Sequence, residues 1–339
     1  MGGGSLSAEL GYWAAQEQHS PEELLRLLTA AEKAGFRRAI SSDHFHPWFH
    51  SGSSSGSTVV WLASALERTN FMTIGTGVTA PIYRYHPAIL AQEFASLDHL
   101  HPGRVAIGVG TGEAMNEVPL GFDWPPFKER IERMEEAIRI LRLLWSEDFV
   151  RFEGRHYRLR GANLYVRPTA SIPINVAASG PKAAELAGQL ADGLLTVPMD
   201  RHRYGEVLFP ALQRGAKAEG RDPSSLRLLL EFKFSFDPDY DRALASIRRW
   251  GATEIPRIFD TEVYDPRELE RMAQEVDSKE LLKTWEVVTD LEDLHGPLEE
   301  YARLGFDEIY LHSSSPDEEG VLAELRRRGL PQWQEGGES

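Results

Sequence analysis

Residues 38–49 read RAISSDHFHPWF, a short apolar run followed by an aspartate, two histidines and a tryptophan. The run at Arg38–Ser42 predicts a β-strand, and after a polar loop the apolar spacing at Thr58–Glu67 predicts a helix. A strand, a polar loop and an amphipathic helix form the pattern expected of a parallel βα unit. This unit places polar side chains where a buried strand ends.

The same unit recurs along the chain of 339 residues. Strands are predicted at Leu10–Ala14, Arg38–Ser42, Met72–Val78, Val105–Val109, Ile174–Ala178, Gly193–Val197, Leu226–Phe236 and Glu308–Leu311. Helices are predicted at Pro21–Ala34, Thr58–Glu67, Pro87–Leu100, Phe127–Leu144 and Pro181–Leu190, several of them with the proline that suits a first helical turn. Eight such units predict a closed (β/α)₈ TIM barrel, with an open doubly wound sheet as the alternative.

Two stretches interrupt this rhythm and are predicted to be insertions. Residues 148–161 have the pattern of a β-hairpin, and residues 251–290 carry two short helical patterns. No low-complexity linker marks a second domain. The prediction is a single barrel domain over residues 8–335.

Composition excludes several classes of partner. The formal net charge of −15 argues against nucleic acid, because binding to phosphates depends on clustered Lys and Arg. No apolar run approaches the roughly 20 residues that span a bilayer, and no signal segment is recognised, so a cytoplasmic protein without a membrane partner is expected. The absence of cysteine excludes disulfides and thiolate chemistry.

In a barrel of this kind, the residues that follow the strands converge on one face, where the chemistry takes place. The predicted converging set is Glu17, Asp43, His44, His46, Trp48, Gly77, Val78, Gly110, Thr111, Gly112, Glu113, Asn116, Ser179, Gly180, Pro181 and Lys182. An imidazole beside carboxylates suits a base that works near neutral pH. The plainer reading of Asp43–His44 is a polar strand exit with a satisfied histidine.

His44 and His46 together could suggest a metal site. No metal is predicted from these two histidines.

Two glycine-containing stretches could be phosphate-binding or nucleotide-binding sites. GVGTGEAMNE, residues 108–117, has the wrong glycine spacing for a dinucleotide fingerprint and follows the fourth strand instead of the first. Its glycines more plainly allow the backbone near Gly110 to approach a flat ligand. AASGPKAAE, residues 177–185, places Ser-Gly at a helix start, which favours a phosphate or is simply a helix end that binds nothing.

Several blocks together carry a resemblance to a known family. GYWAAQEQ (11–18), SDHFHPW (42–48), LASALERTN (62–70), VGTGEAMNE (109–117) and FKERIERMEEAIRILRLLW (127–145) resemble the F420-dependent glucose-6-phosphate dehydrogenases of the bacterial luciferase-like superfamily. The resemblance extends, with gaps, from about Leu10 to the last helix. It implies a (β/α)₈ barrel, a homodimer, and coenzyme F420, a deazaflavin whose tail carries a phosphate.

The resemblance also implies residue roles. Asp43 and Asn116 match cofactor contacts, Gly77–Val78 matches a non-prolyl cis peptide behind the deazaflavin ring, and Ser179, Gly180 and Pro181 match further cofactor contacts. Family members often have Ser where Gly77 stands and Thr where Ala80 stands, so those side-chain contacts are lost here.

The catalytic set implied by the resemblance is His44, Glu113, Trp48 and Glu17. His44 would remove the proton of a substrate hydroxyl while the carbon that bears it gives hydride to the deazaflavin. Glu113 would protonate or balance the ring nitrogen of the cofactor, and Glu17 would orient the substrate or His44. Trp48 would exclude water and stabilise a cationic imidazole.

The chain departs from this family where the substrate phosphate is held. The resemblance implies two lysines and an arginine at three positions, and Asp200, Asp260 and Thr284 stand there instead. Two carboxylates would repel a phosphate dianion but accept hydrogen bonds from sugar hydroxyls. Rebuilt loops could restore phosphate binding through the nearby cations Arg201, Arg203, Arg257 and Lys283.

We therefore expect an F420-dependent sugar dehydrogenase whose substrate is unphosphorylated, first a free aldose such as glucose and second a simple secondary alcohol. The parent glucose-6-phosphate activity stays open. A flavin-dependent monooxygenase of the same superfamily and a non-catalytic deazaflavin carrier are the rival classes.

Overall fold

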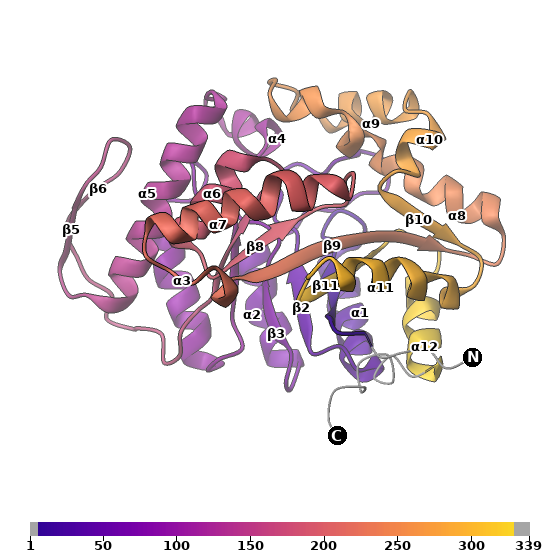
Figure 1. Cartoon of the computed structure of the whole chain (residues 1–339), viewed down its shortest axis with the longest axis horizontal. Coiled ribbons are helices and arrows are strands. Elements are labelled where there is room, and N and C mark those ends of the chain that lie inside the picture. Colours follow the sequence, from indigo (N-terminus) through magenta and orange to yellow (C-terminus); the bar gives the residue numbers. More distant parts are fainter. Residues whose placement is uncertain (1–5, 329–339) are drawn as a thin grey trace.

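The structure, a computed structural model, describes residues 6–328. Its main sheet contains eight parallel strands of a barrel (Figure 1): β1 (Glu9–Ala14), β2 (Arg38–Ser41), β3 (Thr73–Thr76), β4 (Ile107–Val109), β7 (Ile174–Ala177), β8 (Gly193–Thr196), β9 (Arg227–Phe236) and β11 (Glu308–Ser313). Each coincides with a strand predicted from the sequence. The predicted (β/α)₈ barrel is confirmed.

The barrel closes between β3 and β4. The strands are paired in the order β3-β2-β1-β11-β9-β8-β7-β4, and the bridges Ile74–Val105 and Thr79–Val109 join the two ends of this path. Between these bridges the hydroxyl of Thr76 donates to the Gly108 carbonyl oxygen at 2.8 Å and accepts from the Gly108 N–H at 3.1 Å. The Thr76 side chain thus adds two hydrogen bonds between β3 and β4.

Helices cover the outside of the barrel (Figure 1): α1 (Pro21–Ala34), α2 (Thr58–Arg68), α3 (Pro87–Leu100), α5 (Phe127–Ser146), α6 (Pro181–Leu190), α7 (Phe209–Ala218), α8 (Tyr240–Ile247), α11 (His295–Arg303) and α12 (Glu318–Arg328). Local sequence sets their ends. In α1 the Ser20 side chain accepts from the Glu23 N–H, Pro21 opens the first turn, and Gly35 ends the helix at φ 109°. Its leucines, Leu24 and Leu28 among them, are fully buried.

Short helices fill the connections: α4 (Ala114–Glu117), η1 (Val118–Leu120), η2 (Tyr204–Leu208), η3 (Pro223–Ser225) and η6 (Leu291–Leu294). Among the residues that the structure describes, no helix combines the length and apolar character needed to cross a bilayer.

The first insertion is an antiparallel hairpin of β5 (Val150–Glu153) and β6 (Arg158–Ala162), which projects from the barrel (Figure 1). The second contains η4 (Arg248–Glu254), η5 (Pro256–Phe259), α9 (Pro266–Gln274), α10 (Ser278–Leu281) and β10 (Trp285–Val288). The two short helices match the expectation. Strand β10 was not predicted.

Strand β10 lengthens the sheet beyond the barrel. Lys233 pairs with Trp285 of β10 and with His312 of β11, so β10 lies on the edge of β9 opposite β11. The single-domain assignment stays a prediction, and its boundary at residue 335 lies outside the described residues.

The two ends of the barrel differ in chemistry. At the amino ends of the strands, the buried Glu308 carboxylate lies 2.8 Å from an Arg227 nitrogen and 3.4 Å from Arg38 Nε. At the carboxyl ends, inward positions are taken by polar and aromatic side chains. Phe232 faces outward, 6.0 Å from the Tyr301 ring of α11, so its neighbours Glu231 and Lys233 point into the barrel.

Candidate active site

His44 follows β2 and lies against Glu17, which follows the adjacent β1. Nε2 of His44 is 3.1 Å from Oε1 of Glu17, whose side chain is 2% exposed. The other carboxylate oxygen of Glu17 accepts from the Ser42 hydroxyl at 2.7 Å. A buried carboxylate held in this way orients an imidazole and stabilises its protonated form.

The second nitrogen of His44 faces the loop after β4. Its Nδ1 is 3.3 Å from the Asn116 amide nitrogen, which also donates to Glu113 Oε2 at 3.0 Å. The Asn116 amide oxygen accepts from the Phe45 N–H at 2.8 Å, which fixes the orientation of the amide. An amide NH₂ only donates, so Nδ1 carries the lone pair and Nε2 carries the hydrogen that faces Glu17.

Trp48 forms the aromatic wall of this cluster. Its ring meets the His44 ring edge to face, with centroids 6.0 Å apart, and it lies 5.7 Å from the ring of Phe259 in η5. Trp48 is buried. The second insertion therefore helps to shield His44 from water. The structure brings together all four residues of the predicted catalytic set.

Asp43 is buried and belongs to a separate polar cluster next to His44 in the chain. Its carboxylate accepts from the hydroxyls of Thr79 at 2.7 Å and Tyr85 at 3.2 Å, and lies 3.2 Å from an Arg84 nitrogen. Burial, and then the charge of Asp43, raise the pKa of the Tyr85 hydroxyl. The three partners fix the orientation of the Asp43 carboxylate, and the sequence reasoning missed all three.

Glu117 adds a second buried carboxyl to this region. Burial raises its pKa to about 7, against the lowering effect of the Arg84 N–H, which donates to it at 2.8 Å. The neighbouring carboxylates Glu113 and Asp43 raise its pKa further. At neutral pH this group is poised between its two protonation states.

The Gly77–Val78 peptide is cis, as expected from the resemblance. Glycine is required around it by close packing. A Cβ at Gly110 would lie 2.6 Å from Val78 Cγ2, and a Cβ at Gly77 would lie 3.1 Å from the ring of Trp13. The chain is therefore closely packed around the Gly77–Val78 peptide, where the segments that follow β3 and β4 approach each other.

Ser179, Gly180 and Pro181 form the loop into the first turn of α6. Gly180 is the N-cap, no side chain caps this helix, and a Cβ at Gly180 would meet open space. Arg203 lies over the same loop, 3.4 Å from the Ser179 carbonyl oxygen. Free N–H groups at a helix start beside an arginine are suited to a phosphate.

The three predicted substrate positions lie apart from this cluster. Asp200 is exposed and its carboxylate accepts from the His202 N–H at 3.1 Å, and Thr284 Oγ1 is 3.3 Å from the Leu281 carbonyl oxygen. Asp260 is exposed and lies 3.8 Å from a nitrogen of Arg130. Within the part of the chain described, no lysine is found among these contacts.

Arg130 of α5 is the main residue that sequence reasoning missed. It is buried, donates to the Phe259 carbonyl oxygen at 3.0 Å, and reaches the Gly112 carbonyl oxygen at 3.4 Å. Its guanidinium lies 4.2 Å from the centre of the Trp124 ring. Arg130 thus joins the loop that carries Glu113 to the insertion that covers Trp48. An arginine on a charged helix gave no signal of this.

His46 turns away from His44. Its Nδ1 lies 3.0 Å from the Tyr264 carbonyl oxygen, and with His50, Asp265 and Arg267 it lines an outer cavity of about 540 Å³. Over residues 6–328, no three His, Cys, Asp or Glu side chains are grouped as metal ligands would be.

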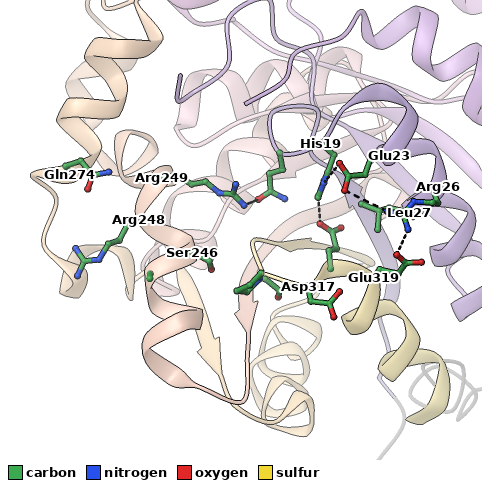
Figure 2. Close-up of a pocket in the computed structure, with 15 residues that line it drawn as sticks. His19, Glu23, Arg26, Leu27, Ser246, Arg248, Arg249, Gln274, Asp317 and Glu319 are labelled. Atoms are coloured by element: carbon green, nitrogen blue, oxygen red, sulfur yellow. Dashed lines mark hydrogen bonds and ion pairs between the residues drawn. The ribbon is translucent and has the colours of Figure 1, made fainter. Parts of the chain in front are cut away.

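A further cavity of about 680 Å³ lies between α1, α8 and the loop before α12 (Figure 2). Arg249, His19 and Glu319 line it, and none of the four catalytic candidates does. The candidate site is therefore defined by the strand ends and not by this outer cavity.

Comparisons with known proteins agree with this geometry. A family model described as "Luciferase-like monooxygenase" matches residues 1–308. An F420-dependent glucose-6-phosphate dehydrogenase of Beutenbergia cavernae is 40% identical over 95% of this chain and 96% of its own, and that of Mycolicibacterium gilvum is 38% identical over 95% and 96%.

A solved structure, an F420-dependent secondary alcohol dehydrogenase in complex with an F420-acetone adduct, superposes with a TM-score of 0.92 at 36% identity. The match covers 96% of this chain and 98% of the other.

Proposed function

The chain belongs to the luciferase-like family, and from this membership we propose that it oxidises an unphosphorylated hydroxyl compound, first a free aldose such as glucose at its anomeric carbon. Like its relatives, it is an oxidoreductase that acts on CH–OH groups and uses coenzyme F420. The proposal concerns the substrate and the residue roles.

His44 is the proposed base. Nδ1 is its proton-accepting atom, because Nε2 donates to Glu17, and the 3.3 Å contact with Asn116 is long enough for a substrate hydroxyl to replace it. Glu17 holds the ring and balances the charge when His44 takes the proton. Glu113, on the other side of Asn116, is placed to hold or supply a proton.

The strand ends fit the cofactor. The first turn of α6 with Arg203 offers donors for a phosphate, and the glycines at 77 and 110 leave a flat backbone wall. When bound, the deazaflavin accepts the hydride from the substrate carbon. Asp43, Asn116, Gly77, Val78 and Gly110 are proposed to hold it on the barrel side, and Ser179, Gly180 and Pro181 on the α6 side.

The observation that supports the substrate proposal is that two carboxylates and a hydroxyl stand at the three positions where the resemblance implies phosphate-binding cations. Asp200, Asp260 and Thr284 supply no positive charge. Of the nearby cations, Arg201 is paired with Glu300, and Lys283 lies 2.6 Å from Glu280. The carboxylates of Asp200 and Asp260 would repel a phosphate dianion, whereas sugar hydroxyls could donate hydrogen bonds to them.

The test is kcat/KM for glucose against glucose-6-phosphate, followed by the loss of oxidised-deazaflavin absorbance. We expect a clear preference for glucose. A preference for the phosphate would return the protein to the activity of its glucose-6-phosphate relatives.

A secondary alcohol is the second candidate substrate, because of the similarity to the dehydrogenase solved with an acetone adduct. Comparing 2-propanol with glucose under the same conditions separates the two. A carrier would bind F420 and turn over neither compound, and a flavin monooxygenase would bind FMN and consume oxygen.

We also propose a homodimer that works in the cytoplasm, as implied by the resemblance. Light scattering of the purified chain tests the first part.

A further inference from the structure

A group of buried polar side chains, called the polar layer below, lies close to His44. It contains Glu231 of β9 and His312 of β11, and His312 stacks on Trp13 of β1 with ring centroids 5.6 Å apart. His44 acts electrostatically on Glu231, so this layer is close to the base. The roles assigned above to His44, Glu17 and Glu113 do not use it.

The tautomer of His312 follows from its partner. Nδ1 lies 2.6 Å from Oε1 of Glu231. Burial acts to raise the pKa of Glu231, but the charge of Lys233 and the hydrogen bond from His312 lower it below its ordinary value. Glu231 is therefore an ionised acceptor, and in the neutral imidazole the hydrogen stands on Nδ1, which leaves Nε2 of His312 as an acceptor.

Two complementary polar atoms lack partners in this layer. Nε2 of His312 and Nε1 of Trp285 are both buried, and neither has a hydrogen-bond partner among residues 6–328. The residues are 2% and 1% exposed, and their rings lie 5.3 Å apart. Buried polar groups without partners are rare and destabilising, so each of these two atoms is available to a polar group of a ligand.

The chemistry of the pair selects that ligand. Nε2 of His312 accepts and Nε1–H of Trp285 donates, and a hydroxyl group does both at once. A phosphate dianion offers only acceptors and would lie beside the Glu231 carboxylate, where it is repelled. The layer therefore suits a neutral compound with a second hydroxyl group.

We infer that His312 and Trp285 together bind a second hydroxyl of the substrate, remote from the carbon that is oxidised, and so select a polyol over a simple alcohol. This rests on the proposed function. Glu231 is the positioning residue that keeps His312 in its accepting tautomer.

The test uses Trp285→Phe, which keeps an aromatic ring and removes the N–H, and His312→Asn, which keeps a donor toward Glu231 and removes Nε2. Each variant should lower the ratio of kcat/KM for glucose to kcat/KM for 2-propanol by about tenfold to a hundredfold, because a hydroxyl loses a buried partner. Trp145→Phe on α5 is the matched control, since its Nε1 donates to the Ala91 carbonyl oxygen away from the site. It should leave the ratio unchanged.

A ratio unchanged in both variants would overturn the inference. If the wild type oxidises 2-propanol but no sugar, the proposed substrate fails while the hydroxyl site remains open to direct measurement. Calorimetric titration of the F420-loaded enzyme with 1,5-anhydroglucitol, which has no anomeric hydroxyl to oxidise, then decides. Binding that weakens at least tenfold in both variants supports the site, and equal or absent binding refutes it.

Discussion

Each ring nitrogen of His44 has one partner, Glu17 at Nε2 and Asn116 at Nδ1. Only Nδ1 carries a lone pair that can accept a proton. His44→Ala should abolish turnover, because a general base supplies about 10²–10⁴ in rate, while the affinity for F420 stays within a few-fold. Stopped-flow rates and a cofactor titration on the same preparation check both parts. A variant that keeps more than about a tenth of the wild-type rate would remove His44 from this role.

Glu117 makes stability depend on pH. Its pKa is about 7 in the folded chain against 4.5 as the ordinary value, so the folded state binds the extra proton between these pH values. The free energy of unfolding therefore falls as pH rises through this window. Glu117→Gln removes the effect and should gain up to about 3 kcal/mol over the wild type at pH 8, with little gain at pH 4.

Urea unfolding of both proteins at pH 4 and pH 8 measures this difference. Glu219→Gln, at the exposed residue that directly follows α7, serves as the control. An equal gain at both pH values would point to packing instead of titration.

Sequence reasoning reached Asp43, His44, Glu113 and Glu17 because each lies in the loop after a strand, within four residues of the strand end, and therefore at the converging face. It missed Arg84 and Tyr85, which reach the site from a loop, and Arg130, which reaches it from the first turn of α5. Their roles depend on tertiary contacts with Asp43, Gly112 and Phe259. No local pattern reports such contacts.

At the scale of elements, helix α5 supports the candidate site through Arg130. Arg130→Leu should lower kcat/KM by about tenfold or more, because the Glu113 loop and the Phe259 segment lose their common tie and the catalytic groups shift. The unfolding free energy should also fall, by about 1–3 kcal/mol, because the Phe259 carbonyl oxygen loses its donor.

Steady-state kinetics with denaturant unfolding measure both quantities. Arg139→Leu, on the exposed face of the same helix, is the control. A kcat/KM that matches the wild type below the unfolding transition, with only the stability lowered, would reduce Arg130 to a structural residue.

The barrel strands were predictable because each is a short apolar run followed by a polar loop and a helix. Strand β10 was not, since WEVV (285–288) stands inside an insertion and is ordered by pairing with the far half of β9. The ten residues of β9 exceed what β8 covers, which leaves an edge for β10. Sequence periodicity does not report an unpaired edge.

For the whole molecule, stability and chemistry lie at opposite ends of the barrel. Glu308→Gln, at the amino ends of the strands, should lower the unfolding free energy by about 2–4 kcal/mol, because Arg38 and Arg227 lose a buried partner. Its kcat/KM should match the wild type below the melting transition. Thermal unfolding and kinetics of Glu308→Gln check this, with the exposed Glu299→Gln of α11 as the control, and a loss of kcat/KM would contradict it.

The hydrogen bonds of Thr76 affect how easily the barrel opens between β3 and β4. Elsewhere neighbouring strands are linked by backbone pairs, but here the Gly108 amide hydrogen is held by a side-chain hydroxyl. A rotation of one χ1 angle releases it, whereas a ladder bond opens only when the strands separate. Deuterium should therefore enter at Gly108 before it enters the amides of β1 or β11 in a hydrogen-exchange experiment, which makes the contact between β3 and β4 the first part of the barrel wall to open.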